Sequence, residues 1–142
     1  MSEPYLAISV VMMPRDANPN PNPAGGAYST VFGGVVLSHI DLAGAVGARR
    51  EVQLRGGNTA AMIVTVAVNR VEFKRPVLVG DVVKFYTTPV RYGRTSLTMR
   101  IDVVAERGGD VIPVTEAEVV YVGVDATTPD HRPTPLGLPA TP

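Results

Sequence analysis

The chain has 142 residues, of which 45% are hydrophobic and 18% are charged, and this composition favours a folded domain with a substantial core over a disordered chain. Its 13 basic residues balance its 13 acidic residues, so it lacks the basic excess of a general nucleic-acid-binding protein. The absence of Cys excludes disulfides, thiolate metal sites and cysteine nucleophiles, and His39 and His131 are too few for a three-histidine zinc site. The N-terminus lacks the basic and apolar stretches of a secretory signal, so we expect a cytoplasmic protein.

The first half of the chain predicts one strand, one loop and one long helix. Residues 5–12 are expected to form the strand. Because proline blocks both helix and sheet hydrogen bonds, the alternate prolines within residues 14–30 predict a loop. Residues 32–48 are almost entirely apolar and predict a buried helix. This run is short for a membrane span and carries Asp41 at its middle, so we expect no membrane partner.

Polar residues on either side of the apolar run suggest where the helix begins and ends. Ser29 or Thr30 is expected to cap its start, because a hydroxyl oxygen can accept a hydrogen bond from a free helix amide. Arg49 and Arg50 are expected at its end, where cations stabilise the negative pole of a helix.

The second half of the chain predicts four strands joined largely by short turns. The expected strands cover residues 62–73, 82–90, 96–105 and 115–124. In the third of these, alternation places one set of apolar side chains on the core face: Leu97, Met99, Ile101, Val103 and Ala105. Gly108, Gly109 and Asp110 form a hairpin signal before the last strand.

The order of elements predicts an α+β architecture, in which a curved antiparallel sheet of five or six strands wraps around the helix. Short turns favour antiparallel neighbours, and a single apolar helix needs a sheet to cover it. One such sheet cannot cover a helix that lacks a polar face, so we expect a second copy of the chain to complete the covering. Residues 1–125 are expected to form this domain, with residues 126–142 as a proline-rich extended tail.

Asp41 is the strongest candidate for chemistry because it lies inside the most apolar segment. Burial disfavours a charged carboxylate, which either acts as a general acid or base beside a cleft or pairs with neighbouring groups in a structural role. His39 is two residues away and points to another side of the helix, so it is interpreted as a packed or interface histidine and not as a catalyst. Gly33 and Gly34 are placed to present free amides to a developing oxyanion, although close packing also explains them.

A group of basic residues in the strand region is a candidate phosphate site. Residues 91–96 combine two arginines, a glycine and the hydroxyl groups of Thr95 and Ser96 at the start of a strand. Arginines in such a group bind phosphate oxygens well, whereas the alternative interpretation is a solvated face of the sheet.

Several segments together resemble the hotdog-fold acyl-CoA thioesterases, in particular the small bacterial type with one hotdog domain per chain. The run Phe-Lys-Arg-Pro-Val-Leu-Val-Gly-Asp at residues 73–81, taken with residues 32–45, makes the resemblance specific. Further matching segments are residues 13–18, 64–68, 93–96, 115–117 and 121–122. The resemblance covers most of the region from Met12 to Asp125.

The resemblance implies hydrolysis of an acyl-CoA to a fatty acid and free CoA. It implies that Asp41 acts as base or nucleophile, that the Gly34 amide polarises the thioester carbonyl, and that Asn18 works from the partner subunit. It implies CoA contacts from Thr65, Val66, Ala67, Gly93, Arg94, Thr95 and Ser96, with Lys74 and Arg75 for the phosphates. It also implies no metal, no cofactor apart from the CoA of the substrate, and homodimers that assemble into hexamers as trimers of dimers.

The loop before the helix departs from the family pattern. Residues 19–30 form a longer, proline-rich insertion, and the expected Asn-Gly step is absent, so Asn20 and Asn22 stand beside Asn18 as candidates for the loop asparagine. Two further functions stay open. The first is a module that binds acyl-CoA without catalysis. The second is a hotdog enoyl-CoA hydratase, which is the weaker alternative because its motif needs a histidine that residues 20–23 lack.

Overall fold

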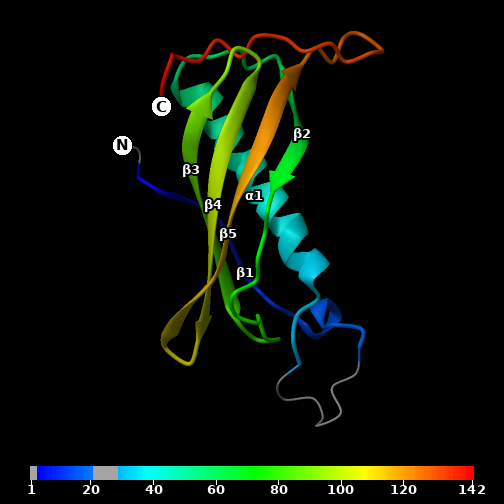
Figure 1. The fold of residues 1–142 in the computed structure, drawn as a ribbon, viewed down its shortest axis with the longest axis vertical. Helices are drawn as coiled ribbons and strands as arrows, with labels where there is room; N and C mark the ends of the chain where they lie inside the picture. The colour runs from blue at the N-terminus through cyan, green and yellow to red at the C-terminus, as the bar shows by residue number, and fades with distance from the viewer. Residues whose placement is uncertain (1–2, 21–28) are drawn as a thin grey trace.

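The computed structural model describes residues 3–20 and 29–142 and contains one sheet and one long helix. In chain order the elements are β1 (Tyr5–Val11), a 3-10 turn (Pro14–Asp16), α1 (Gly33–Leu54), β2 (Met62–Asn69), β3 (Val82–Tyr92), β4 (Ser96–Arg107) and β5 (Asp110–Val124). The strands pair antiparallel in the order β1-β3-β4-β5-β2, and α1 lies across one face of the sheet (Figure 1). This is the predicted hotdog architecture, with five strands.

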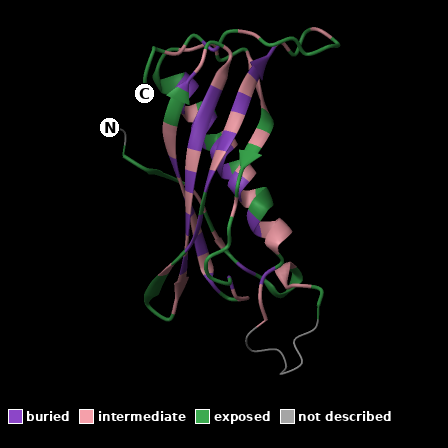
Figure 2. Ribbon diagram, viewed as in Figure 1, coloured by how far each residue is buried: buried purple, intermediate pink, exposed green. Residues whose placement is uncertain are grey.

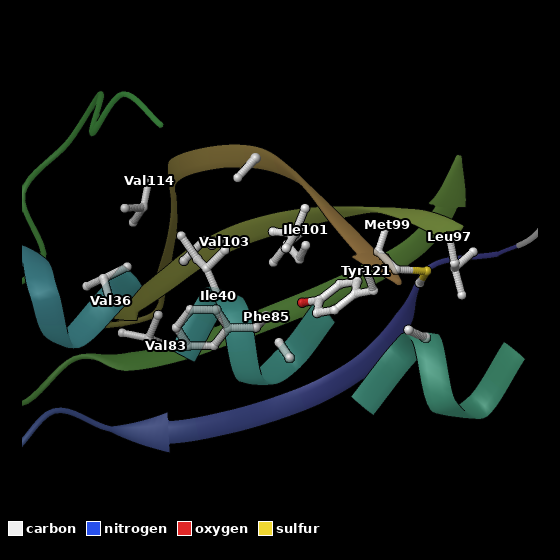
Figure 3. Packing of buried hydrophobic residues seen from close by; sticks show 14 of the residues in the cluster. Val36, Ile40, Val83, Phe85, Leu97, Met99, Ile101, Val103, Val114 and Tyr121 are labelled. Carbon is white, nitrogen blue, oxygen red and sulfur yellow. The ribbon is translucent and has the colours of Figure 1, made fainter. Parts of the chain in front are cut away.

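The core lies between α1 and the sheet, as the alternation in β4 predicted. Figure 2 shows buried and partly buried positions alternating along β4 and β5. The five predicted core residues of β4 are all 1% exposed or less, and Ile40 of α1 and Phe85 of β3 are fully buried against them (Figure 3). The β4–β5 turn also follows the prediction: Gly108 and Gly109 both adopt positive φ, as a two-residue hairpin turn requires.

The predicted start of the helix at residue 32 agrees with the structure, but the predicted cap and the predicted C-terminal end were wrong. The residue that caps α1 is Phe32, and it does so through its backbone alone. Thr30 is engaged in an extended bridge with Leu78, so it is not placed at the cap position. At the other end α1 continues to Leu54, because its last turns bury Glu51, whose carboxylate accepts a hydrogen bond from the Tyr92 hydroxyl. Arg49 and Arg50, which were expected at the end of the helix, lie inside it.

The strand predictions need two smaller corrections. β2 ends at Asn69 and not at residue 73, although the following chain stays beside the sheet, where the Lys74 amide donates to the Val114 carbonyl over 2.9 Å. β5 begins at Asp110, five residues earlier than predicted, because it pairs with β4 directly from the hairpin turn. The described part of the chain holds no helix that meets the length and hydropathy needed to cross a membrane.

Gly47 allows α1 to approach the sheet closely. A Cβ atom at this position would lie 2.8 Å from the Thr87 Cβ and 2.9 Å from the Met99 Cε. We expect Gly47→Ala to lower the free energy of unfolding by about 1–2 kcal/mol, since overpacking costs about 1–3 kcal/mol and the gain in helix propensity returns up to about 1 kcal/mol. Urea unfolding measures the change.

Gly33→Ala is the matched control for that substitution. A Cβ at Gly33 meets only the Phe73 ring, at an ordinary 3.5 Å, so the control should keep wild-type stability. Equal stability of the Gly47→Ala and Gly33→Ala variants would contradict the close approach.

Candidate active site

Asp41 lies on α1, partly buried, where the helix crosses β2 and β5. The Thr65 hydroxyl of β2 donates to Asp41 Oδ1 over 2.6 Å. The Tyr121 hydroxyl of β5 donates to the Asp41 backbone carbonyl over 2.7 Å and lies 3.3 Å from Oδ1. The Asp41 carboxylate forms no ion pair with residues 3–20 or 29–142. Its second oxygen, Oδ2, also accepts no hydrogen bond from these residues. The carboxylate is therefore oriented through one oxygen, while the other is available to a water molecule.

Tyr121 is the site residue that the sequence did not reveal as a partner of Asp41. Its ring is fully buried in the core, with the hydroxyl end toward α1 (Figure 3). Burial, reinforced by the neighbouring Asp41 carboxylate, raises the pKa of Tyr121 far above its usual value, so the hydroxyl remains a donor. Gly44, one turn after Asp41, leaves the space for it: a Cβ there would lie 2.1 Å from the hydroxyl oxygen. Gly44, a glycine inside an apolar helix, is the sequence feature that could have indicated this close contact.

The first turn of α1 begins with two glycine amides. The amides of Gly33 and Gly34 donate to none of the described residues, whereas the next amide, of Val35, donates to the Phe32 carbonyl. Free amides at a helix start favour a negatively charged oxygen. Seven positions of helix separate Gly34 from Asp41, which corresponds to about 10 Å along the axis.

Asn18 pairs with the segment that leads into α1. Its amide donates to the Thr30 carbonyl over 2.8 Å, and the adjacent Ala17 bridges Val31. The Asn18 Oδ1 accepts from the amide of Asn20 over 3.0 Å. Of the three candidate asparagines, Asn18 is thus paired with the segment that leads into α1, Asn20 is exposed, and Asn22 lies outside the described residues.

The residues predicted to contact CoA divide into two groups. Thr65 contacts Asp41, and a bulge in β2 leaves Val66 exposed between Thr65 and Ala67. The turn of Gly93, Arg94, Thr95 and Ser96 lies at the same end of the sheet, because Ser96 pairs with Val122 and Val122 pairs with Val64.

Lys74 and Arg75 lie at the other end of the sheet. The Lys74 amide bonds to Val114, eight residues along β5 from Val122 and so about 26 Å away. The Lys74 ammonium lies 3.5 Å from a Glu116 carboxylate oxygen, with both side chains at least half exposed. Arg75 forms no ion pair within the described part of the chain and lines a 380 Å³ pocket that Gly33 and Phe73 also line.

His39 is packed, as predicted. Its ring stacks on Phe85 with 5.6 Å between centroids, and Nδ1 lies 2.8 Å from the Val35 carbonyl oxygen. Within residues 3–20 and 29–142, no three His, Asp or Glu side chains cluster closely enough to hold a metal ion.

Known proteins share this fold and sequence along nearly the whole chain. A sequence profile of the Thioesterase superfamily matches residues 28–112. The acyl-CoA thioester hydrolase YciA of Salmonella typhimurium is 36% identical over 136 residues, 92% of this chain and 89% of that protein. Cj0915, a hexameric hotdog fold thioesterase of Campylobacter jejuni, is 36% identical over 92% of this chain and 89% of its own, with a TM-score of 0.72. The hexameric thioesterase y2039 from Yersinia pestis is 32% identical over 99% of both chains, with a TM-score of 0.76. The chain therefore belongs to the thioesterase superfamily and has the hotdog fold.

Proposed function

We propose that this chain hydrolyses acyl-CoA thioesters to a carboxylic acid and free CoA. The observation that carries the proposal is the Asp41 carboxylate, oriented by the Thr65 and Tyr121 hydroxyls through one oxygen and open at the other. The name of the Salmonella relative, an acyl-CoA thioester hydrolase, gives independent support for the substrate class.

The proposed reaction uses two groups of the chain. Asp41 Oδ2 takes a proton from water as the water oxygen attacks the thioester carbonyl carbon. The carbonyl oxygen becomes negative and is stabilised by the Gly34 amide. The carbon–sulfur bond then breaks, and the CoA thiolate leaves with the proton that Asp41 had taken from water, which returns Asp41 to its carboxylate form. In a second route, Asp41 attacks the thioester carbonyl directly and displaces the CoA thiolate. Water then hydrolyses the resulting acyl anhydride.

We further propose that each site is built from two copies of the chain. A thioester carbonyl cannot meet both groups within one protomer, because Gly34 and Asp41 lie about 10 Å apart on the same helix. Leu37, Leu42 and Val46 of α1 are 37% to 57% exposed in the single chain, which supports a partner that covers this face. A homodimer would set Asp41 of one copy against the Gly34 amide and Asn18 of the other. The hexameric Campylobacter and Yersinia structures support a trimer of such dimers.

The CoA moiety is proposed to bind along the end of the sheet that holds Thr65 and the turn of Gly93, Arg94, Thr95 and Ser96. Val66 and Ala67 continue this surface along β2. Lys74 and Arg75 belong to the opposite end of the same chain, so they would reach the phosphates of a CoA held mainly by the partner. Arg75 is the better candidate of the two, because Lys74 is already paired with Glu116.

A thiol-release assay over a panel of acyl-CoA chain lengths tests the proposed function. We expect stoichiometric free thiol and carboxylic acid for at least one chain length, and the same rate after treatment with a metal chelator. A direct titration with the same compounds runs in parallel. Binding without thiol release would support the acyl-CoA-binding module instead, and hydration of an enoyl-CoA would support the hydratase.

A further inference from the structure

We propose that residues 133–136 form a strap, anchored by Leu136, that positions the Arg94–Ser96 turn for CoA binding. This inference rests on the proposed function and adds a positioning element to it. In Figure 1 the chain after β5 crosses the end of the sheet at which β3 and β5 terminate. The strap lies in that crossing, and Leu136 is its one fully buried residue.

Backbone hydrogen bonds tie the strap to three separate parts of the fold. Pro133 bridges Val124, and the Thr134 amide donates to the Gly123 carbonyl over 2.8 Å. The Leu136 amide donates to the Arg94 carbonyl over 3.0 Å. The Leu136 carbonyl accepts from the Asn58 amide over 2.7 Å. One residue therefore connects the β3–β4 turn to the segment that follows α1.

Two glycines in the body of the domain leave room for the strap. A Cβ at Gly123 would lie 2.4 Å from the Leu136 Cδ2 atom. A Cβ at Gly57 would lie 2.6 Å from the Leu136 backbone oxygen, which has little freedom to move. Neither glycine adopts positive φ, so neither is required by backbone conformation. The close approach of the strap is the reason that a side chain does not fit at either position.

The strap acts on the turn proposed to hold CoA. Its bond to the Arg94 carbonyl and the bond from the Gly123 amide to the Thr95 carbonyl, at 2.8 Å, fix two successive peptide groups of that turn. Exposed polar turns lose affinity for a ligand when they must be ordered during binding, and a preformed turn avoids that loss. The strap makes no hydrogen bond to Asp41, whose described side-chain partners are Thr65 and Tyr121. It should therefore affect the binding of CoA more than the chemical step.

Leu136→Ala tests this role in the full-length protein. We expect the KM for acyl-CoA to rise about tenfold and the Kd for free CoA to rise in parallel, with kcat within about twofold of wild type. Leu136→Met, which keeps an apolar side chain of similar volume, should restore most of the affinity. Removal of the exposed residues 139–142 is the matched control and should leave KM and Kd unchanged.

Gly123→Ala is a second, independent route to the same result. Its Cβ should displace the Leu136 side chain while the strap sequence stays intact, so it should reproduce the higher KM. Thermal melting of both variants shows that the domain is folded at the assay temperature. A folded Leu136→Ala variant with a wild-type KM, or one that loses kcat at an unchanged KM, would overturn the strap proposal. Failure of the wild-type protein to release thiol would instead overturn the proposed function.

Discussion

Replacing Asp41 by Asn should lower kcat for acyl-CoA hydrolysis by about 10²–10⁴-fold, the usual contribution of a general base. Asn has the same shape and keeps a side-chain oxygen that accepts from Thr65, and the backbone carbonyl that accepts from Tyr121 is unchanged, so the helix and its contacts should be preserved. What is lost is the ability to accept a proton from water. The measurement is thiol release under saturating acyl-CoA, with circular dichroism and thermal melting to confirm an intact fold.

Ser38→Ala is the matched control for the Asp41 substitution. Ser38 lies one turn before Asp41 on α1, is exposed, and donates only to the Val35 carbonyl of its own helix. It should retain wild-type kcat. An Asp41→Asn variant that keeps more than about half of wild-type turnover would remove Asp41 from the reaction, whichever of its two proposed roles is considered.

Arg107→Ala should produce the largest loss of stability among single substitutions at charged residues, about 2–3 kcal/mol at neutral pH. The Asp81 side chain is only 2% exposed and accepts two hydrogen bonds from Arg107, at 2.8 and 2.7 Å. Without the guanidinium, the buried carboxylate keeps only the Leu78 amide as a donor among the described residues. Arg132→Ala is the control, because its pair with Asp130 is exposed and should contribute little.

The Asp81–Arg107 pair should make the stability loss of Arg107→Ala depend on pH, and the direction of that dependence can be predicted. Burial pushes the pKa of Asp81 upward, but the Arg107 hydrogen bonds and the Leu78 amide outweigh it and hold the pKa below its usual value of 3.8. A lowered folded-state pKa stabilises the protein above about pH 4, and the contribution disappears as pH falls through the folded-state value. In Arg107→Ala the burial of Asp81 raises the pKa of its carboxyl with less opposition, so Asp81 is protonated more readily as pH falls. The difference in unfolding free energy between wild type and Arg107→Ala should therefore be smaller at acid pH. Urea unfolding at pH 7 and pH 3.5 measures both values; a deficit that grows toward acid would contradict the assignment.

The fold was predictable where a pattern is local and periodic. The alternation from Leu97 to Ala105 identified the core face of β4 because side chains in a strand point to opposite faces at every step. The end of α1 was not predictable in this way. Arg49 and Arg50 look like an end signal, yet the helix continues because Glu51 is buried against Tyr92, a residue 41 positions away that no local pattern identifies.

The candidate site was predictable in part, for a similar reason. Asp41 was identifiable because a single carboxylate in an apolar helix needs an explanation. Its contact with Tyr121 joins residues 80 positions apart and depends on the register of β5 against the helix. The tail offers a second example: its prolines predicted an extended chain, but the burial of Leu136 depends on space left by Gly57 and Gly123. Such contacts come from the assembled fold and not from the segments that make them.

A subunit-mixing experiment tests most directly whether Asp41 and the Gly34 amide act on one thioester across two copies of the chain. The two parents are Asp41→Ala and Gly34→Pro, the latter removing an amide in the first turn, where proline is tolerated. Each parent alone should be inactive, while Gly33→Pro keeps the Gly34 amide and serves as control. Unfolding and refolding the parents together should form mixed dimers with one intact site each, so about a quarter of wild-type activity should return. If the mixture stays as inactive as its parents although mixed dimers have formed, the shared site is contradicted.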